Sequence, residues 1–399
     1  MNMQKSRILF VTEESINGVF TVISSLIESW PNEDEIFLLS NRLHWAKDEL
    51  GLMSKNKKFV LLKSPFYSPI DIYKLSKLKG VKLGLLKLFI KILTPLYLVY
   101  TTYKLIAVLK NNRINVIFSH NGGLPGGFLP RCILYAAKFS KLKNIISVIH
   151  NYPVTPKVKL YSFFRNILIS NSVTEIVSVS QAVANSINSD TNINKNIKVI
   201  HNGIKLNFDS DVNIIQFPKW NNRENLILFL GELTHRKGLH VLIESLSNVQ
   251  YNFTLVVFGG GEDEDYINYC KDLISKYNLS ENVFFEGFDI NAKNYIKFFD
   301  LLILPSLYGE SLPMVILEAF KSKTTVISTN VGGISEIIKS RETGILIAPN
   351  SQTELSESII ELLTNKDFSN RLSDTAFELL KNDLSIDKCV DKYKSLINS

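Results

Sequence analysis

The chain has 399 residues, of which 45% are hydrophobic and 21% charged, and its formal net charge at neutral pH is +7. This length predicts about two to three domains, and the composition excludes a disordered protein, a collagen-like repeat and a disulfide scaffold. Three scattered cysteines without CxxC spacing predict neither a zinc site nor disulfide bonds, and the apolar start is too short for a signal peptide. We therefore expect a cytosolic protein.

Short apolar runs alternate with longer helical segments along the whole chain. Such alternation is typical of parallel sheets covered by helices on both faces. The runs that predict strands are 8–12, 35–40, 58–63, 115–119, 145–150, 175–180 and 197–201, followed by 226–231, 253–259, 282–286, 300–305, 324–328 and 345–348.

The domain boundary is expected where this pattern is interrupted. The interval 205–224 is polar, has no hydrophobic period and contains Pro218, so it predicts a linker. We expect an α/β protein with two Rossmann-like domains, 1–204 and 225–375, facing each other across a cleft. The segment 376–399 is expected to be helical and to cross back to the N-terminal domain. Ligands of open α/β sheets bind at the carboxyl ends of strands, so the chemistry is expected in strand-to-helix loops.

Basic residues are concentrated in one third of the sequence. Between Ile72 and Thr174 there are 16 lysine and arginine residues and no aspartate or glutamate, whereas the rest of the chain has a net charge of −9. Such asymmetry predicts an anionic partner for one surface. No nucleic-acid-binding motif accompanies the charge, which disfavours nucleic acid as that partner.

The segment Leu83–Leu109 is apolar and punctuated by lysines and aromatic residues, a pattern typical of a helix that lies in a membrane interface. Its longest uncharged stretch, 92–103, is shorter than the roughly 20 residues that span a bilayer, and Pro95 is expected to end or kink a helix. A buried helix with solvated lysines is the alternative. The lysines expected to face an anionic membrane are at positions 74, 77, 79, 82, 87 and 91.

Two glutamates flank a predicted helix start in the second half. In residues 303–320, ILPSLYGESLPMVILEAF, a strand is followed by a turn at Gly309 and Glu310, and Pro313 suits the first position of a helix that carries Glu318. The N–H groups at such a helix start can bind an anion, while carboxylates on each side hold hydroxyl groups of the same ligand. Taken alone, two ordinary solvated glutamates are the alternative.

The sequence around these glutamates resembles the family 4 glycosyltransferases of the GT-B fold. Gly309-Glu310 and Glu318-Ala319 match their Glu-x7-Glu element, and Gly231–Gly238 (GELTHRKG) is similar to their G-x-L … R-K-G element. The similarity is dense from about 197 to 350 and sparse before it. Further segments that fit are 256–262, 285–288, 299–306, 326–336 and 343–346.

The resemblance implies glycosyl transfer from a nucleotide-diphosphate sugar, with retention of the anomeric configuration and without an essential metal. Glu310 would bind hydroxyl groups of the donor sugar, and Glu318 those of the ribose. Negative charge grows on the diphosphate as the glycosidic bond breaks, and fixed cations and N–H groups stabilise that charge. The residues implied to lie beside the diphosphate are Arg236, Lys237, Ser311, Leu312 and Met314.

One position departs from the family pattern. Glu232 stands where many relatives have arginine. A carboxylate cannot neutralise phosphate, so either Arg236 or another base compensates or the affinity for the diphosphate is lower; a degenerate, inactive member of the family is a further alternative. Phe288–Ile290 occupies the region where relatives meet the nucleobase, but it does not indicate which base is bound.

The N-terminal half offers fewer candidates. Gly18 follows the first predicted strand and would bring backbone close to the donor phosphate, with an ordinary turn as the alternative. His150 ends a predicted strand in the position of the family's cleft histidine, which meets the donor sugar or the reacting centre. His120 ends another strand and could serve the acceptor, whereas His201 is expected to be structural. The predicted catalytic set is Glu310, His150 and Lys237.

We therefore expect a retaining glycosyltransferase that builds surface polysaccharide on a lipid-linked saccharide acceptor, as a peripheral protein on the cytoplasmic face of an anionic membrane. The N-terminal domain of GT-B enzymes usually holds the acceptor, and here that domain is the basic one. The alternatives are a glycosyltransferase with a soluble acceptor, a sugar-nucleotide epimerase, and a non-catalytic membrane-bound protein that binds sugar nucleotides.

Overall fold

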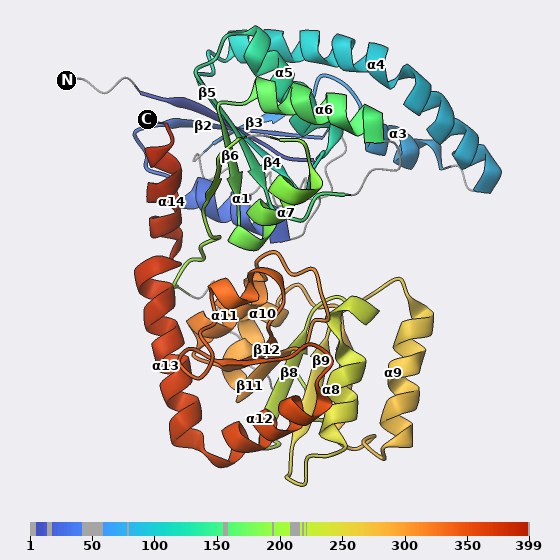
Figure 1. Cartoon of the computed structure of the whole chain (residues 1–399), viewed down its shortest axis with the longest axis vertical. Helices are drawn as coiled ribbons and strands as arrows, with labels where there is room; N and C mark the ends of the chain where they lie inside the picture. The colour runs from blue at the N-terminus through green and yellow to red at the C-terminus, as the bar shows by residue number, and fades with distance from the viewer. Residues whose placement is uncertain are drawn as a thin grey trace. The chain divides into compact units, whose positions relative to one another are not determined.

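The structure is a computed structural model that describes residues 5–13, 18–41, 59–77, 80–154, 159–193, 195–207, 216–217, 219–220 and 222–397; the side chains at 80–81, 91 and 159–164 fall outside this description. It divides into two compact units (Figure 1). The N-terminal unit is Met1–His201 with Cys389–Ser399, and the C-terminal unit is Asn202–Lys388.

The N-terminal unit is built on a parallel sheet with the strand order β3-β2-β1-β4-β5-β6-β7. The strand order reverses between β1 and β4, which places the topological switch point there. The strands are β1 Arg7–Val11, β2 Glu35–Ser40, β3 Val60–Lys63, β4 Val116–Asn121, β5 Asn144–Ile149, β6 Glu175–Ser178 and β7 Ile197–Val199. The helices are α1 Gly18–Ser29, α3 Pro69–Ser76, α4 Gly80–Asn111, α5 Phe128–Phe139, α6 Lys159–Ser172 and α7 Gln181–Asp190.

The C-terminal unit is built on a second parallel sheet, with the order β10-β9-β8-β11-β12-β13 and its switch point between β8 and β11. The strands are β8 Leu226–Leu230, β9 Thr254–Phe258, β10 Val283–Gly287, β11 Leu301–Leu304, β12 Thr325–Thr329 and β13 Ile345–Ile347. The helices are α8 Leu239–Leu246, α9 Glu264–Lys276, α10 Ala292–Tyr295, α11 Met314–Ser322, α12 Gln352–Thr364 and α13 Lys366–Asp383, with short 3₁₀ turns η1 His235–Lys237, η2 Ile296–Phe298 and η3 Gly332–Glu336. The last helix, α14 Ile386–Ser395, belongs to the N-terminal unit from Cys389 onward.

Strand positions follow directly from the apolar runs. The central strands β1, β8, β9 and β11 are buried along nearly their whole length, as expected of parallel strands covered on both faces. All thirteen predicted strands are present, with ends that differ from the prediction by no more than two residues. The prediction of a two-domain α/β protein with Rossmann-like sheets is confirmed.

The predicted linker 205–224 needs correction where the structure describes it. Trp220 is fully buried, stacks on Phe217 with ring centroids 5.0 Å apart, and donates its indole N–H to Glu286 at 2.8 Å. These aromatic side chains pack on the sheet of the C-terminal unit because their burial offsets the cost of ordering the segment. Pro218 lies outside the described residues.

The C-terminal boundary also differs from the prediction. Helix α13 runs through the expected break after 375 because its apolar face stays buried on the C-terminal unit, through Phe368, Leu372, Ala376 and Leu380. The chain joins the N-terminal unit from Cys389 onward. There Tyr393 of α14 packs edge-on against Phe118 of β4, with centroids 5.5 Å apart.

Helix α4 differs from the expectation at Pro95. It continues unbroken through that residue over 32 residues. Pro95 lies on an exposed part of the helix, so water can hydrate the carbonyl that loses its N–H partner. The segment Ile92–Asn111 is also long and apolar enough, by length and composition, to cross a membrane, which corrects the prediction that this region is too short.

Candidate active site

The predicted donor-site residues lie at the switch point of the C-terminal sheet. Lys237 follows β8 and Glu310 follows β11, the two central neighbouring strands. Carboxyl ends of parallel strands meet at the same edge of a sheet, and ligands of open α/β sheets bind where the strand order reverses. Two motifs separated by about 70 residues in the sequence therefore come together.

A tight turn positions the two basic side chains. Arg236 and Lys237 lie in η1, and the following Gly238 has φ 72°, a left-handed conformation that favours glycine. A Cβ at Gly238 would collide with the carbonyl oxygen of Pro305. The amide of Leu307 also donates to the carbonyl of Arg236 at 2.8 Å, which ties this turn to the loop after β11.

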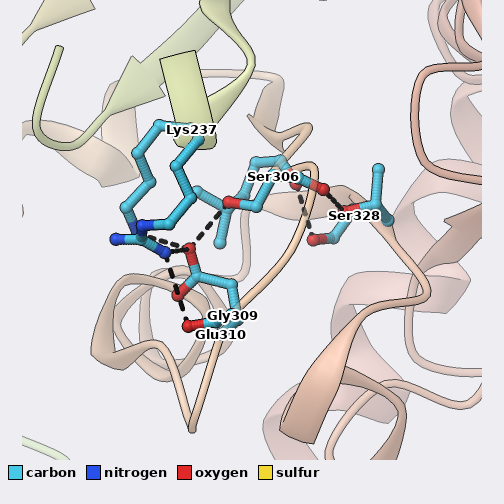
Figure 2. Close-up of polar contacts among 8 residues, drawn as sticks. Lys237, Ser306, Gly309, Glu310 and Ser328 are labelled. Atoms are coloured by element: carbon cyan, nitrogen blue, oxygen red, sulfur yellow. Dashed lines mark hydrogen bonds and ion pairs between the residues drawn. The ribbon is translucent and has the colours of Figure 1, made fainter. Parts of the chain in front are cut away.

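Glu310 is the centre of a compact polar cluster (Figure 2). One of its carboxylate oxygens accepts hydrogen bonds from Lys237 Nζ at 2.6 Å, Arg236 Nη1 at 2.9 Å and Ser306 Oγ at 2.7 Å. Its side chain is only 7% exposed. Burial by itself would raise the pKa of Glu310, but Lys237, Arg236 and Ser306 outweigh burial and hold the pKa below its ordinary value. The cluster is therefore ionised, with two positive charges and one negative charge.

The neighbouring strand fixes the backbone of this loop. Thr329 at the end of β12 donates its hydroxyl to the carbonyl of Ser306 at 2.5 Å, and Ser328 donates to the carbonyl of Leu304 at 2.8 Å. The amide of Gly333 donates to the carbonyl of Glu310 at 2.8 Å. Hydrogen bonds from two elements thus preorganise the loop that carries Glu310.

The start of α11 faces the same loop. Pro313 occupies the N-cap position, one residue earlier than predicted, and among the described residues no side chain caps this helix or places an acid in its first turn. The first backbone N–H groups of a helix have no intrahelical partner and favour anions. Ser311 and Leu312 are buried, and Met314 is the first helical residue.

Glu318 lies on the helix that follows the Glu310 turn. It lies in the second turn of α11, is 13% exposed and forms an ion pair with Lys321 at 3.8 Å. The structure therefore brings Arg236, Lys237 and Glu310 into direct contact and pairs Glu318 with Lys321. Glu232, which stands where many relatives have arginine, is exposed. The second cation that contacts Glu310, besides Lys237, is Arg236.

Sequence reasoning missed Ser306 and Lys321. Ser306 ends the strand immediately before the Glu310 turn, and Lys321 follows Glu318 at the i,i+3 spacing that allows helical side chains to meet. Both signals are visible in the sequence once the helix is placed. The loop after β10 also presents an exposed aromatic residue, Phe288, which is 78% exposed, and Ile290, which is 51% exposed.

The N-terminal unit brings His150 and His120 together. His120 Nδ1 lies 2.9 Å from His150 Nε2, and the two rings stack with centroids 5.2 Å apart. Burial lowers the pKa of His150 to about 3; burial, followed by the neighbouring His150, lowers the pKa of His120 well below its usual value. Both imidazoles are therefore neutral at pH 7, and the N–H of one ring donates a hydrogen bond to the bare nitrogen of the other.

Gly18 and His201 are the remaining candidates of the N-terminal unit. Gly18 begins α1, and a Cβ there would meet no described atom within 4 Å, so no backbone contact in the described part of the chain demands glycine; most of the preceding loop, 14–17, lies outside it. The carbonyl of His201 accepts a hydrogen bond from Cys389 of α14.

Glu13 is a partly buried acidic residue that the sequence did not single out as a site residue. It follows β1 at the switch point of the N-terminal sheet and accepts the Leu129 amide at the start of α5, at 3.2 Å. Burial, its largest influence, raises the pKa of Glu13. A carboxylate of the protein itself therefore occupies the start of α5, in contrast to the start of α11.

The family models cover both units. A model described as Glycosyltransferase Family 4 matches residues 73–208, and one described as Glycosyl transferases group 1 matches residues 211–379. The chain belongs to the family 4 glycosyltransferases. The resemblance seen in the Glu310 and Lys237 motifs is thereby confirmed.

Curated relatives of the chain include several named for surface polysaccharides. An uncharacterised glycosyltransferase of Methanocaldococcus jannaschii is 31% identical over 49% of this chain and 52% of its own. A lipopolysaccharide core biosynthesis glycosyltransferase of Rhizobium meliloti is 25% identical (44% and 50%), and an O-antigen chain mannosyltransferase of Escherichia coli is 29% identical (43% and 46%). The matches span about half the length of these relatives.

Solved structures share the fold over the whole chain. A glycosyltransferase from Rickettsia africae has a TM-score of 0.77 at 19% identity and covers 100% of both chains. HepE from Anabaena, solved in complex with UDP, has a TM-score of 0.72 at 16% identity, and the match covers 98% of this chain and 99% of HepE. The GT-B fold is thus confirmed.

Proposed function

We propose that this protein transfers a sugar from a nucleotide-diphosphate sugar to a saccharide acceptor, with retention of the anomeric configuration. The observation that carries the proposal is the cluster of Lys237, Arg236 and Glu310 at the β8/β11 switch point, beside the start of α11. Its excess of one positive charge suits a diphosphate, and HepE, of the same fold, is solved with UDP. No single sugar or base is favoured by these residues.

The cluster offers a physical account of the transfer step. Breaking the glycosidic bond leaves negative charge on the diphosphate oxygen, and Lys237, Arg236 and the first N–H groups of α11 are fixed cationic or dipolar groups that would stabilise it. Ser306 and the two basic residues hold Glu310 in one orientation, so its carboxylate is ready to accept hydroxyl groups of the donor sugar. Glu318 is assigned to the ribose, and His150 to the sugar or the reacting centre.

The acceptor is proposed to be a lipid-linked saccharide of surface polysaccharide biosynthesis, used on the cytoplasmic face of the membrane. Two relatives named for lipopolysaccharide core and O-antigen synthesis support this class of product. The acid-free stretch Ile72–Thr174, with 16 basic residues, supports an anionic surface as a partner.

Turnover with a panel of nucleotide sugars tests the proposal. We expect at least one donor to be consumed in the presence of a lipid-linked saccharide, with the product keeping the donor's anomeric configuration by NMR. Glu310→Gln should lower transfer by about 100-fold or more, whereas Glu361→Gln, which alters an exposed ion pair with Arg341 in the same unit, should leave transfer unchanged. Binding of donors without turnover, or full transfer by Glu310→Gln, would overturn the proposal.

A further inference from the structure

An unusually apolar surface runs along α4. The helix exposes large apolar side chains over five turns, far more than a soluble helix leaves in water. Figure 1 shows the N-terminal part of α4 beside α3 and beyond the strands of the sheet. The exposed apolar residues are Leu85, Leu88, Phe89, Ile92, Leu93, Leu96, Val99, Tyr100 and Tyr103.

Side chains of two neighbouring helices extend this apolar surface, and a groove lies between them and α4. Phe139 at the end of α5 is 73% exposed, and Leu168 of α6 is 54% exposed. Between them and α4 lies an open groove of about 510 Å³. We call α4 with these two side chains and the groove the α4 face. The groove is lined mainly by apolar atoms, including those of Leu98, Ile106 and Tyr135.

Positive charge accompanies the α4 face. Exposed lysines lie on α3 and directly after it, along α4, and at the end of α5 and just beyond it, in a stretch of sequence that contains no acidic residue. An apolar surface framed by one sign of charge is complementary to an anionic lipid layer, where the apolar side chains enter the hydrocarbon and the lysines meet the headgroups. The exposed lysines of this stretch, among the described side chains, are Lys74, Lys77, Lys82, Lys87, Lys104, Lys110, Lys138, Lys141 and Lys143; Lys79 and the side chain of Lys91 lie outside the described residues.

The C-terminal half of α4 is held to the protein. Leu105 and Leu109 are buried in the core of the N-terminal unit, and Thr101 is buried against Cys132 of α5 at 3.3 Å. Tyr97 donates its hydroxyl to the carbonyl of Tyr67 at 2.6 Å. A helix crossing the bilayer would have to leave these contacts and expose the core, so the geometry favours a helix lying in the interface.

We propose that the α4 face docks on an anionic lipid bilayer, with lipid hydrocarbon filling the groove between α4, α5 and α6. The surface places the N-terminal unit at the membrane where a lipid-linked acceptor would be held. One part of this inference rests on the proposed function, namely that the bilayer surface is the cytoplasmic leaflet of the membrane.

Sedimentation with vesicles of phosphatidylcholine, with and without phosphatidylglycerol, tests the docking. The full chain should bind the anionic vesicles and be released at 1 M salt, where the Debye length falls to about 3 Å. The triple variant Leu96→Gln, Phe139→Gln, Leu168→Gln should bind about 100-fold more weakly, because three apolar side chains no longer enter the hydrocarbon. The matched control Tyr251→Gln, Tyr269→Gln changes exposed apolar residues of the C-terminal unit and should bind like the wild type.

Three outcomes would overturn the docking proposal. They are wild-type binding by the triple variant, failure of the unaltered chain to bind anionic vesicles, and resistance of the bound protein to alkaline carbonate extraction, which would indicate a spanning helix. Binding of nucleoside diphosphates, measured on the same preparations, separates this proposal from the proposed function. A folded triple variant should bind nucleoside diphosphates as the unaltered chain does. Absence of nucleoside-diphosphate binding by the unaltered chain would count against the donor site alone.

Discussion

Glu310 shows how one carboxylate can organise two cations. Lys237 and Arg236 both donate to the same oxygen of Glu310, and the negative charge of that carboxylate offsets the repulsion between the two cations. Removing a buried carboxylate from such a cluster leaves uncompensated charge, which is costly. The same residue thus serves the folded loop and the proposed donor site.

The lowered pKa of Glu310 predicts how stability depends on pH. A carboxyl group with a folded pKa below its unfolded value of 4.5 contributes stability above that value and loses it as the pH falls through the folded pKa. Urea unfolding at a series of pH values should show a smaller loss below pH 4.5 in Glu310→Gln than in the wild type. An equal fall of the unfolding free energy below pH 4.5 in the two proteins would contradict the ionised cluster.

The histidine pair predicts a second pH effect at higher pH. His150 has a folded pKa of about 3 against 6.5 unfolded, so the unfolded chain binds the proton first and stability falls as the pH drops from about 6.5 toward 3. Each such histidine contributes a slope of up to about 1.4 kcal/mol per pH unit. His120→Phe should reduce the slope of the unfolding free energy between pH 6.5 and 4.5. An unchanged slope would contradict the buried neutral pair.

At the scale of single elements, Gly238 is the residue whose backbone most constrains the site. Gly238→Ala requires a left-handed conformation of alanine and a collision with Pro305, so we expect a loss of more than about 2 kcal/mol in the unfolding free energy and displacement of Lys237. Gly260→Ala, where a Cβ would make an ordinary 3.5 Å contact with Phe288, is the control. Equal unfolding free energies for the two variants would contradict this role of Gly238.

Helix α14 offers a test of its docking on the N-terminal sheet. Tyr393 is 1% exposed, and its hydroxyl has no hydrogen-bond partner among the described residues. Tyr393→Phe should therefore raise the unfolding free energy by about 1 kcal/mol. Tyr266→Phe should lower it by a similar amount, because that hydroxyl lies 3.0 Å from His240 Nδ1. Destabilisation by Tyr393→Phe would contradict the buried, unpaired hydroxyl.

The strands could be predicted from the sequence because each is a short apolar run between polar segments. The sequence also indicated a helix over Leu83–Leu109, but not its continuation through Pro95, because proline argues locally against a helix and the apolar side chains follow no helical period. The second half of α4 is helical because Leu105 and Leu109 are buried in the core, a long-range contact. The placement of Trp220 likewise depends on a partner, Glu286, that lies 66 residues away.

Residues of the candidate site could be predicted where they belong to a recognisable sequence motif. Lys237 and Glu310 belong to motifs at fixed spacing, and sheet topology then places them together. The pairing of His120 with His150 depends on neighbouring strands β4 and β5, whose order the sequence does not state. Gly18 and its loop had the weakest motif and remain a prediction.

At the scale of the whole molecule, the two units carry different parts of one proposed activity. The C-terminal unit contains the Lys237 cluster, whereas the N-terminal unit contains the histidine pair, the acid-free basic stretch and the α4 face. Charge is therefore segregated along the chain, between a region suited to an anionic surface and a remainder with a net charge of −9. Within that acidic remainder, an anionic donor would meet the local excess of positive charge at Lys237 and Arg236.

Calorimetric titration with nucleoside diphosphates tests the central claim most directly. The wild type should bind at least one of UDP, GDP and ADP more tightly than the matching monophosphate. Lys237→Met should weaken that binding by about tenfold or more, while Lys366→Met, which removes an exposed lysine paired with Asp300 at 2.7 Å in the same unit, should not. Equal affinity in the Lys237→Met variant and the wild type, or no binding of any nucleoside diphosphate, would contradict a diphosphate site at the β8/β11 switch point.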